Sequence, residues 1–382
     1  MFSFKGKSRL SDNTVEPCHR VRPYASVVAT VLKFLLGAFF VFSALSKFVS
    51  IDNFNIYIFS FGFLSLRLSI VVGWLAVSTE MLLGVALLSN RHHRLVCLLN
   101  LLLLIAFTFF LLYAWFAGRT DSCHCMGDLM PFDPIRSILK NAVLILLVLF
   151  AMRYANDSWR QRWWIALPIV LVVQGLIVLC GFQGWVKMNY YDLQYSTTLS
   201  VLMAVVAALA SLRFSRRLWV EILMCLTPYV AVFILCTAAC LAPVHGSVPV
   251  NSDKLAATIG MGGALEDCNL THGRKVVSFY SKSCQYCRRT SEAISMIQQR
   301  HDLPKEAFYT VFPGDTVHGL DKFYSSPYAV RFSLLAIPSD DFVQIIYGSA
   351  PLVVLLDDGK VCGTYGSGYI SETELVEFLK MK

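Results

Sequence analysis

The sequence predicts a polytopic α-helical membrane protein with about seven spans, followed by a C-terminal soluble α/β domain. Of its 382 residues, 56% are hydrophobic and 15% are charged, and the mean hydropathy is +0.58. The apolar residues lie in runs of about 20, the length that crosses a hydrocarbon core of about 30 Å. The formal charge of +8 comes from Lys and Arg placed between these runs, not from a basic stripe. This pattern excludes nucleic acid as a partner and indicates the lipid bilayer.

The apolar runs also predict how the chain is oriented. The spans are expected at about 26–49, 66–89, 95–117, 134–153, 163–185, 195–213 and 218–241. Cations precede the first span and recur in alternate loops, for example Arg91 and Arg94 between the second and third spans. The positive-inside rule therefore places the N-terminus in the cytoplasm, and an odd number of spans carries the C-terminus outside. We expect a multi-pass protein of the bacterial inner (cytoplasmic) membrane, with its soluble domain on the periplasmic or extracellular side.

The composition divides the chain into five parts. We expect a cytoplasmic basic tail over 1–25, a four-helix membrane domain over 26–155, a further three-helix membrane segment over 156–241, a linker over 242–264 and the soluble domain over 265–382. The linker is expected because prolines and glycines recur in it. Within the soluble domain, the long segment 301–346 is interpreted as an inserted helical element.

Short signals predict the elements of the soluble domain. A buried strand at 276–280 leads into Cys284-Gln285-Tyr286-Cys287, and a helix follows over 288–300. A second buried strand at 351–356 turns through Asp-Asp-Gly into 360–365, which predicts a hairpin. A closing helix over 371–380 begins with a capping box. The domain is therefore α/β, with the two cysteines at a strand-to-helix turn.

Cys284 and Cys287 are predicted to be a redox pair. Only a thiolate exchanges with disulfides, and a helix N-terminus lowers a thiol pKa. Cys284 would be the exposed nucleophile and Cys287, a turn inside the helix, the resolving thiol. A zinc site is the alternative, but it needs a second pair of ligands, and neither Cys268 nor Cys362 has a close partner in the sequence. Whether Cys268 and Cys362 form a disulfide or stay free is left open.

Residues 265–382 resemble the thioredoxin-like family. The resemblance rests on Phe279-Tyr280 leading into the Cys284–Cys287 motif, and on Ala350-Pro351 at the start of the hairpin strand. It implies that Pro351 forms a cis peptide bond, packs beside the cysteines and shapes the substrate groove. Gln285-Tyr286 replaces the Gly-Pro of thioredoxin, and residues at these two positions help to set the redox potential.

A second cysteine pair, Cys123 and Cys125, lies in the polar loop between the third and fourth spans. A disulfide between cysteines two apart closes a very small, strained ring, and strained disulfides are more oxidising. The pair is therefore interpreted as a labile electron relay. Copper(I) binding is the alternative, because His124 and Met126 would complete a soft ligand set. By topology this loop lies on the same side of the membrane as the soluble domain.

Residues 27–155 resemble the MauE/DoxX family of four-helix membrane proteins. The matching stretches are Phe-Ser-Ala-Leu-Ser-Lys at 42–47, Glu-Met-Leu-Leu-Gly at 80–84, Cys-His-Cys-Met-Gly at 123–127 and Ser-Ile-Leu-Lys-Asn at 137–141. MauE-type proteins are linked to disulfide formation in an exported enzyme, together with a thioredoxin-like partner. The resemblance implies redox chemistry for this chain, with that partner fused to it.

Several polar residues in the spans have two interpretations each. Glu80 is either a functional group or a structural ion-pair partner of Lys47 or Arg67. Lys47 and Arg136 are also candidates for snorkelling anchors. Cys236 and Cys240, one turn apart in the last span, are interpreted as packed thiols, since their helical spacing suits a disulfide poorly; a third relay is the alternative.

Together these patterns predict a membrane thiol–disulfide oxidoreductase. Cys284 and Cys287 would react with exported thiol or disulfide proteins and exchange electrons with Cys123 and Cys125. Oxidation of substrate thiols is the favoured direction, with no covalently bound cofactor. A membrane quinone is the acceptor implied by the resemblance to quinone-linked four-helix disulfide enzymes. Reduction of periplasmic disulfides, copper handling with an accessory redox domain, and a structural subunit are the alternatives. The client protein, the oligomeric state and the role of 163–241 are left open.

Overall fold

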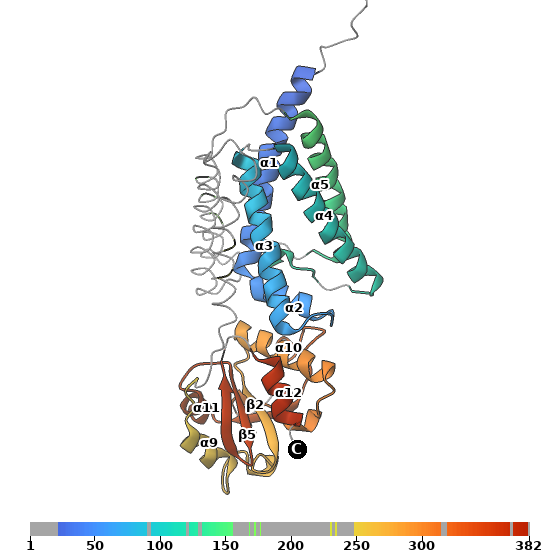
Figure 1. The fold of residues 1–382 in the computed structure, drawn as a ribbon. Coiled ribbons are helices and arrows are strands. Elements are labelled where there is room, and N and C mark those ends of the chain that lie inside the picture. The colour runs from blue at the N-terminus through green and yellow to red at the C-terminus, as the bar shows by residue number, and fades with distance from the viewer. Residues whose placement is uncertain are drawn as a thin grey trace, which may run out of the picture.

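The protein is described from a computed structural model, shown in Figure 1. The residues that the structure describes are 22–89, 93–119, 122–128, 132–155, 248–314, 319–366 and 370–380, with the single positions 168, 172, 176, 230 and 234. The predicted spans at 163–185, 195–213 and 218–241, and with them Cys236 and Cys240, lie outside this part of the chain.

Four helices form the membrane domain: α1 (Arg22–Val49), α3 (Leu66–Ser89), α4 (His93–Phe116) and α5 (Pro134–Tyr154). Each is long and apolar enough to cross a membrane, so the chain is a multi-pass membrane protein. They coincide with the first four predicted spans to within a few residues. The helices stand side by side, and the soluble domain lies at one end of the bundle (Figure 1).

Glycines bring α1 and α3 close together. A Cβ atom on Gly84 would lie 2.9 Å from the backbone nitrogen of Val41, and one on Gly37 would lie 3.0 Å from the carbonyl oxygen of Gly84. Small residues at such crossings let helix backbones approach where no hydrophobic effect drives association within lipid. The bundle therefore has one tight helix pair.

A short helix that the sequence analysis did not predict, α2 (Ile51–Phe59), joins α1 to α3. It buries Ile51, Phe54 and Ile58 on one face, against the core formed by α1 and α3. Nine residues are too few to cross a bilayer, so a search for long apolar runs passes over it. Because α2 lies across the end of the bundle, it forms a platform between the bundle and the soluble domain (Figure 1).

The soluble domain is built on a five-stranded sheet of order β4-β3-β2-β5-β6. Its strands are β2 (Arg274–Phe279), β3 (Phe308–Pro313), β4 (Ser333–Ile337), β5 (Leu352–Asp357) and β6 (Lys360–Tyr365). β2 pairs parallel with β3 and antiparallel with β5, and β3 pairs parallel with β4. Its helices are α9 (Ser252–Ile259), α10 (Gln285–Arg300), α11 (Ser339–Ile346) and α12 (Glu372–Lys380).

This arrangement confirms the predicted strand–cysteine–helix order, the hairpin and the closing helix. Asp358 and Gly359 have φ of 46° and 77°, and two successive positive values define the turn that suits a two-residue hairpin. Ser371 accepts a hydrogen bond from the backbone nitrogen of Glu374 at 3.3 Å, which is one of the two bonds of a capping box, while the Glu374 carboxylate accepts from the Tyr365 hydroxyl.

Two expectations about the soluble domain were wrong. The described part of the expected linker, 248–264, contains α9 and belongs to the domain: Leu255 and Ile259 pack into its core, and Lys254 forms an ion pair with Asp341 at 2.6 Å. The segment 301–346 is not a helical insertion, since it supplies β3, β4 and α11. The sequence patterns did not predict α9 because it is short and followed by glycines. They did not predict β3 and β4 because polar residues lie between these short strands.

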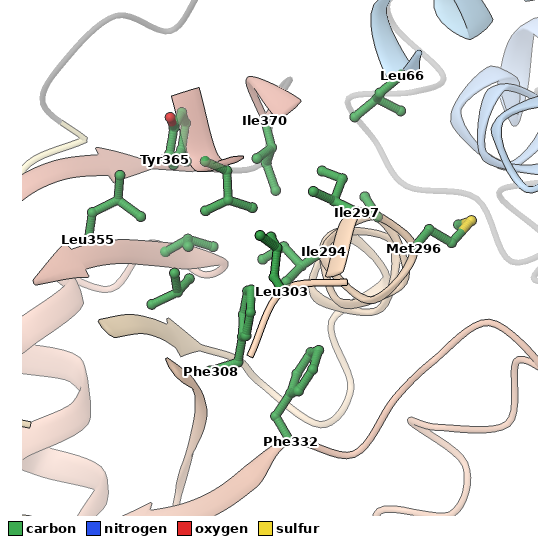
Figure 2. Packing of buried hydrophobic residues seen from close by; sticks show 14 of the residues in the cluster. Leu66, Ile294, Met296, Ile297, Leu303, Phe308, Phe332, Leu355, Tyr365 and Ile370 are labelled. Atoms are coloured by element: carbon green, nitrogen blue, oxygen red, sulfur yellow. The ribbon is translucent and has the colours of Figure 1, made fainter. Parts of the chain in front are cut away.

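The soluble domain is docked on α2 and on the start of α3. Leu66 reaches a hydrophobic cluster that also holds Ile294 and Ile297 of α10 (Figure 2), and Ile56 and Phe59 of α2 belong to the same cluster. This packing fixes the soluble domain at one end of the membrane domain.

Charged groups complete the docking. Arg289 bonds to the carboxylate of Asp52 at 3.0 Å and to the side-chain oxygen of Asn53 at 2.8 Å. Arg300 donates to the backbone carbonyls of Phe59 at 3.0 Å and Leu64 at 2.7 Å. These contacts link α10 to both ends of α2. The helix α10, which begins at the CxxC motif, therefore lies directly on the platform formed by α2.

Candidate functional site

The CxxC motif lies at the start of α10, as predicted. Cys284 is the N-cap residue, and its sulfur accepts a hydrogen bond from the backbone nitrogen of Cys287 at 3.4 Å. The Cys287 sulfur accepts one from the nitrogen of Ser281, also at 3.4 Å. Cys287 is fully buried, whereas Cys284 is half-buried. Cys284 is thus the more accessible of the two thiols, and their roles as nucleophile and resolving thiol stay predictions.

The two thiols differ in acidity. The hydrogen bond with Cys287, with help from backbone N–H groups and Arg288, lowers the pKa of Cys284 to about 6. Burial and the neighbouring Cys284 sulfur raise the pKa of Cys287. Cys284 is therefore a thiolate at neutral pH, and Cys287 is a protonated thiol.

Pro351 lies beside these cysteines. The Ala350–Pro351 peptide bond is cis, as the family resemblance implies. The carbonyl oxygen of Ala350 lies 3.8 Å from the Cys284 sulfur. A proline loop therefore forms one wall of the surface at the nucleophile.

Cys123 and Cys125 are not on an exposed loop. The chain folds back into the bundle, forming the short strand β1 (Cys125–Asp128), and buries Cys123 completely and Cys125 to 7% exposure. Gly127 makes this path possible: its φ is +60°, and a Cβ atom there would lie 2.1 Å from the carbonyl oxygen of Ser46 in α1. The Cys-x-Cys-x-Gly spacing thus inserts both thiols among the helices, which the polar loop sequence did not predict.

The two thiols of this pair also differ. The Ser137 hydroxyl lies 3.1 Å from the Cys123 sulfur. A hydrogen bond from Cys125, together with this hydroxyl, lowers the pKa of Cys123 to about 6, against the effect of burial. The same bond and burial raise the pKa of Cys125. The pair therefore repeats the pattern of the CxxC motif, in which one cysteine has a lowered pKa and the cysteine beside it has a raised pKa.

Glu80 forms an ion pair inside the bundle. Its carboxylate lies 2.5 Å from the Lys47 ammonium, which also donates to the Ser43 hydroxyl at 2.9 Å. Lys47 is 2% exposed, so it is not a snorkelling anchor. Arg136 is largely exposed and lies 3.6 Å from Asp133. The ion-pair interpretation of Glu80 is therefore confirmed, with Lys47 as its partner.

The helix α2 separates the two cysteine pairs. Tyr57 of α2 packs on Cys123 and Cys125 together with Phe61 and Phe110, and the rings of Tyr57 and His124 are 6.3 Å apart. The other side of α2 carries α10, through the contacts of Asp52 and Asn53. Both pairs thus lie at the same end of the bundle, with one layer of helix between them.

Side chains around His124 link the loop to the soluble domain. Burial raises the pKa of Glu292 on α10, and the nearby His124 opposes that rise. Arg119, three residues beyond the end of α4, hydrogen-bonds to Tyr328 of the soluble domain and donates to the carbonyl oxygen of Ser60 at 2.8 Å. The soluble domain therefore also contacts the segment that leads into the CxC loop.

Within the part of the chain that the structure describes, the other cysteines do not extend the site. Cys268 and Cys362 are free thiols in the structure, and Cys97 is buried in the bundle as expected of a small hydrophobe. Among the described residues, no three His, Cys, Asp or Glu side chains converge as they would around a metal ion.

Sequence reasoning missed several residues of this site. Ser137 and Lys140 appeared only within a family motif, Tyr57 belongs to the unpredicted α2, and Arg300 and Glu372 act across the domain interface. A signal for α2 was present: Ser50 precedes a run with apolar residues at the first, fourth and eighth positions, as in an amphipathic helix. No local pattern indicates contacts between residues 300 positions apart.

Known proteins resemble both halves of the chain. Residues 25–154 match the family described as methylamine utilisation protein MauE. Over 297 residues the chain is 23% identical to Protein TlpB of Flavobacterium psychrophilum, covering 72% of this chain and 74% of that protein. The sheet and its cysteine-bearing helix fit the thioredoxin-like fold. The chain thus joins a MauE-like four-helix membrane unit to a thioredoxin-like domain.

Proposed function

We propose that this protein is a membrane thiol–disulfide oxidoreductase that passes electrons between Cys284/Cys287 and Cys123/Cys125. One observation carries the proposal: two cysteine pairs, each with one favoured thiolate, lie at the same end of the bundle in domains that are docked on each other. The MauE-like and thioredoxin-like resemblances support the same chemistry.

The exchange follows from the geometry of each pair. The Cys284 thiolate attacks the Cys123 sulfur of a Cys123–Cys125 disulfide, the S–S bond breaks, and its electron pair leaves on Cys125. Cys287 then loses its proton to solvent and attacks Cys284 in the mixed disulfide, which releases Cys123 as a thiolate. Two electrons have then moved from the soluble domain into the membrane domain.

The docked state represents one stage of this cycle. Cys123 is completely buried beneath Tyr57 of α2 and Phe61, so the Cys284 sulfur reaches it only when the soluble domain leaves α2 and α2 itself moves off the CxC loop. The half-exposed Cys284 remains open to a protein substrate while the domain is docked. Substrate exchange and internal exchange therefore take place in different arrangements of the two domains.

Oxidation of exported thiol proteins is the direction we propose. A thiolate stabilised in the reduced form makes the corresponding disulfide more oxidising, and the pKa of Cys284 near 6 is below that of an ordinary thiol. Electrons that reach Cys123 and Cys125 then need an acceptor. A quinone dissolved in the bilayer is the class of acceptor we propose, because the pair is buried among membrane helices.

The test is the redox state of Cys284 and Cys287 in membranes, read as an alkylation mass shift, in wild type and in Cys125→Ser. We expect the pair to be oxidised in wild type and to accumulate in the reduced form in Cys125→Ser. Cys97→Ser is the matched control, because it removes a buried thiol of the same bundle outside both pairs, and it should behave as wild type.

Two other outcomes would contradict the proposal in different ways. A pair that is reduced in wild type and oxidised in Cys125→Ser would show that electrons run outward, so that the protein reduces its substrates. An identical redox state in all three proteins would exclude transfer between the pairs.

A further inference from the structure

A small polar cavity lies between the helices beside Cys125. Its volume is about 20 Å³, room for about one water molecule. Cys125 lines it together with leucine and phenylalanine side chains from α1, α4 and α5, and its polar lining comes from Ser43, Lys47, Glu80, Lys140 and Asn141. A cavity this small does not admit a quinone ring, but it suits a single water between ionisable groups.

The charges around the cavity come from three helices. α1 contributes Lys47, α3 contributes Glu80 and α5 contributes Lys140, while α4 adds only apolar side chains. Lys47 and Glu80 neutralise each other at 2.5 Å. Lys140, which is half-buried, forms no ion pair or hydrogen bond with any residue that the structure describes. Lys140 therefore brings an ammonium group that is not ion-paired with any described residue to the cavity that Cys125 also lines, and the two groups interact electrostatically.

Thiol exchange creates a difficulty at this place. When the Cys123–Cys125 disulfide is broken, a thiolate appears on Cys125, which is 7% exposed. A buried anion is costly unless it is paired or neutralised. Cys123 has the Ser137 hydroxyl at 3.1 Å, whereas the Cys125 thiol donates to the sulfur and to the carbonyl oxygen of Cys123, the latter at 3.6 Å, and neither of these two groups donates a hydrogen bond to a Cys125 thiolate. A proton donor is needed on the cavity side of Cys125.

We propose that Lys140 is an internal proton donor to Cys125, acting across the water-sized cavity, with the Lys47–Glu80 ion pair holding the surrounding charge in place. The inference rests on the proposed exchange between the two cysteine pairs and assigns its proton step. The site takes a proton and a water molecule, not an organic ligand.

The step balances with the groups already described. The exchange begins with the Cys284 thiolate, the Cys287 thiol, the Cys123–Cys125 disulfide and the Lys140 ammonium. It ends with the Cys284–Cys287 disulfide, the Cys123 thiolate, the Cys125 thiol and neutral Lys140. One proton has passed from Lys140 to Cys125 and one from Cys287 to solvent, and reprotonation of Lys140 resets the site.

The first measurement is the reaction of Cys125 with methyl methanethiosulfonate in the reduced full-length protein in lipid nanodiscs, followed by peptide mass spectrometry against pH. Lys140→Met removes the nearby cation and should raise the midpoint of this pH profile by about 1 unit or more. Lys140→Arg keeps the charge and should leave the midpoint within about 0.5 unit of wild type. This readout requires no electron transfer between the two pairs.

The second measurement is the rate at which dithiothreitol reduces the Cys123–Cys125 disulfide by first reducing the Cys284–Cys287 pair. The rate in Cys284→Ser measures direct reduction of Cys123–Cys125 by dithiothreitol and is subtracted. Lys140→Met and Lys140→Arg should both slow the Cys284-dependent rate at least tenfold, because arginine does not release its proton. Lys33→Met is the control, because Lys33 is a buried lysine in α1 that does not line the cavity. It should match wild type in both measurements.

The outcomes separate this inference from the function on which it rests. Equal reduction in wild type and Cys284→Ser would exclude the relay, while the pH midpoint would still report on Lys140. An unchanged midpoint in Lys140→Met would exclude an influence of Lys140 on Cys125. A normal rate in Lys140→Arg would reduce its role to that of a fixed charge and overturn proton donation.

Discussion

Replacing Glu372 by glutamine should loosen the soluble domain from the membrane domain. Glu372 begins α12, yet its carboxylate accepts the backbone N–H of Leu66, the first residue of α3, at 3.0 Å. The other carboxylate oxygen lies 3.2 Å from Arg300 and 2.8 Å from His301. One side chain of the soluble domain thus caps a membrane helix and holds the arginine that binds the end of α2.

The magnitude follows from the kind of hydrogen bond that is lost. The Glu372 side chain is only 10% exposed, so solvent replaces little of what is removed. Hydrogen bonds to a charged group contribute about 1.5–3 kcal/mol each, against about 0.5–1.5 kcal/mol between neutral groups. Glutamine keeps the size and one acceptor but loses the charge, which leaves a net loss of about 2 kcal/mol over the three bonds. Since about 1.4 kcal/mol is a factor of ten, docking should weaken roughly 30-fold.

Hydrogen exchange at the amide of Leu66, in the full-length protein in nanodiscs, measures this loss. Glu372→Gln should lower its protection roughly 30-fold. Glu374→Gln is the matched control, because Glu374 lies on the same helix but bonds to Tyr365 within the soluble domain, at 2.7 Å. In this variant the protection of the Leu66 amide should not change. A change below about threefold in Glu372→Gln, or an equal change in the control, would refute the docking role.

The pH dependence of the docking has a defined sign. Burial tends to raise the pKa of Glu372, but the Leu66 amide, His301 and Arg300 outweigh it and lower the pKa. A carboxyl group with a lowered pKa stabilises the docked state above its ordinary value of about 4.3. That stabilisation is lost as the pH falls through the lower, docked-state value. Protection of Leu66 should therefore fall only in acid below about pH 4.3.

Three further perturbations test the remaining parts of the site. Gly127→Ala should cost at least about 2 kcal/mol in the free energy of unfolding, measured by denaturation in detergent, because it combines positive φ with a backbone clash; Gly118→Ala, with φ +73° but open space around it, should cost less, and equal losses would contradict the reasoning. Glu80→Gln should destabilise by about 3–5 kcal/mol by leaving Lys47 buried and unpaired, and the double variant with Lys47→Met should recover most of that loss if the pair is the cause. The rate of alkylation of Cys284 should have its pH midpoint near 6, and a midpoint near 8.5 would show that its pKa is not lowered. Because the folded-state pKa is lowered, the thiolate stabilises the reduced fold fully above about pH 8.5. This stabilisation is lost as the pH falls through about 6.

Local signals predicted the parts of the fold that local forces decide. Runs of apolar residues identified α1, α3, α4 and α5, because crossing a bilayer imposes a length and a composition. The Asp-Asp-Gly turn and the Ser371 capping box are likewise set by a few adjacent residues. α2 and α9 were missed because a short helix is stabilised by what it packs against, and that partner lies far away in the sequence.

The candidate site was only partly predictable for the same reason. Spacing identified all four cysteines, and the helix N-terminus predicted a lowered pKa for Cys284, although the hydrogen bond with Cys287 contributes more to it than the backbone N–H groups do. The burial of Cys123 and Cys125 depends on a turn at Gly127 that fits against Ser46, some 80 positions earlier. A polar loop sequence is typical of exposed loops, and only the packing of α1 against β1 shows that this one is inserted into the bundle.

The docked arrangement changes the role expected of the tether between the domains. A flexible linker would let the soluble domain meet the CxC loop by diffusion within a restricted volume. In the structure the soluble domain is held by Arg289, Arg300 and Glu372 on the very helix that covers Cys123 and Cys125. If the proposed exchange takes place, its rate depends on the free energy of undocking as well as on linker length. Variants that weaken the docking without touching a cysteine should therefore speed the exchange, until the domain stays undocked long enough for diffusion to set the rate.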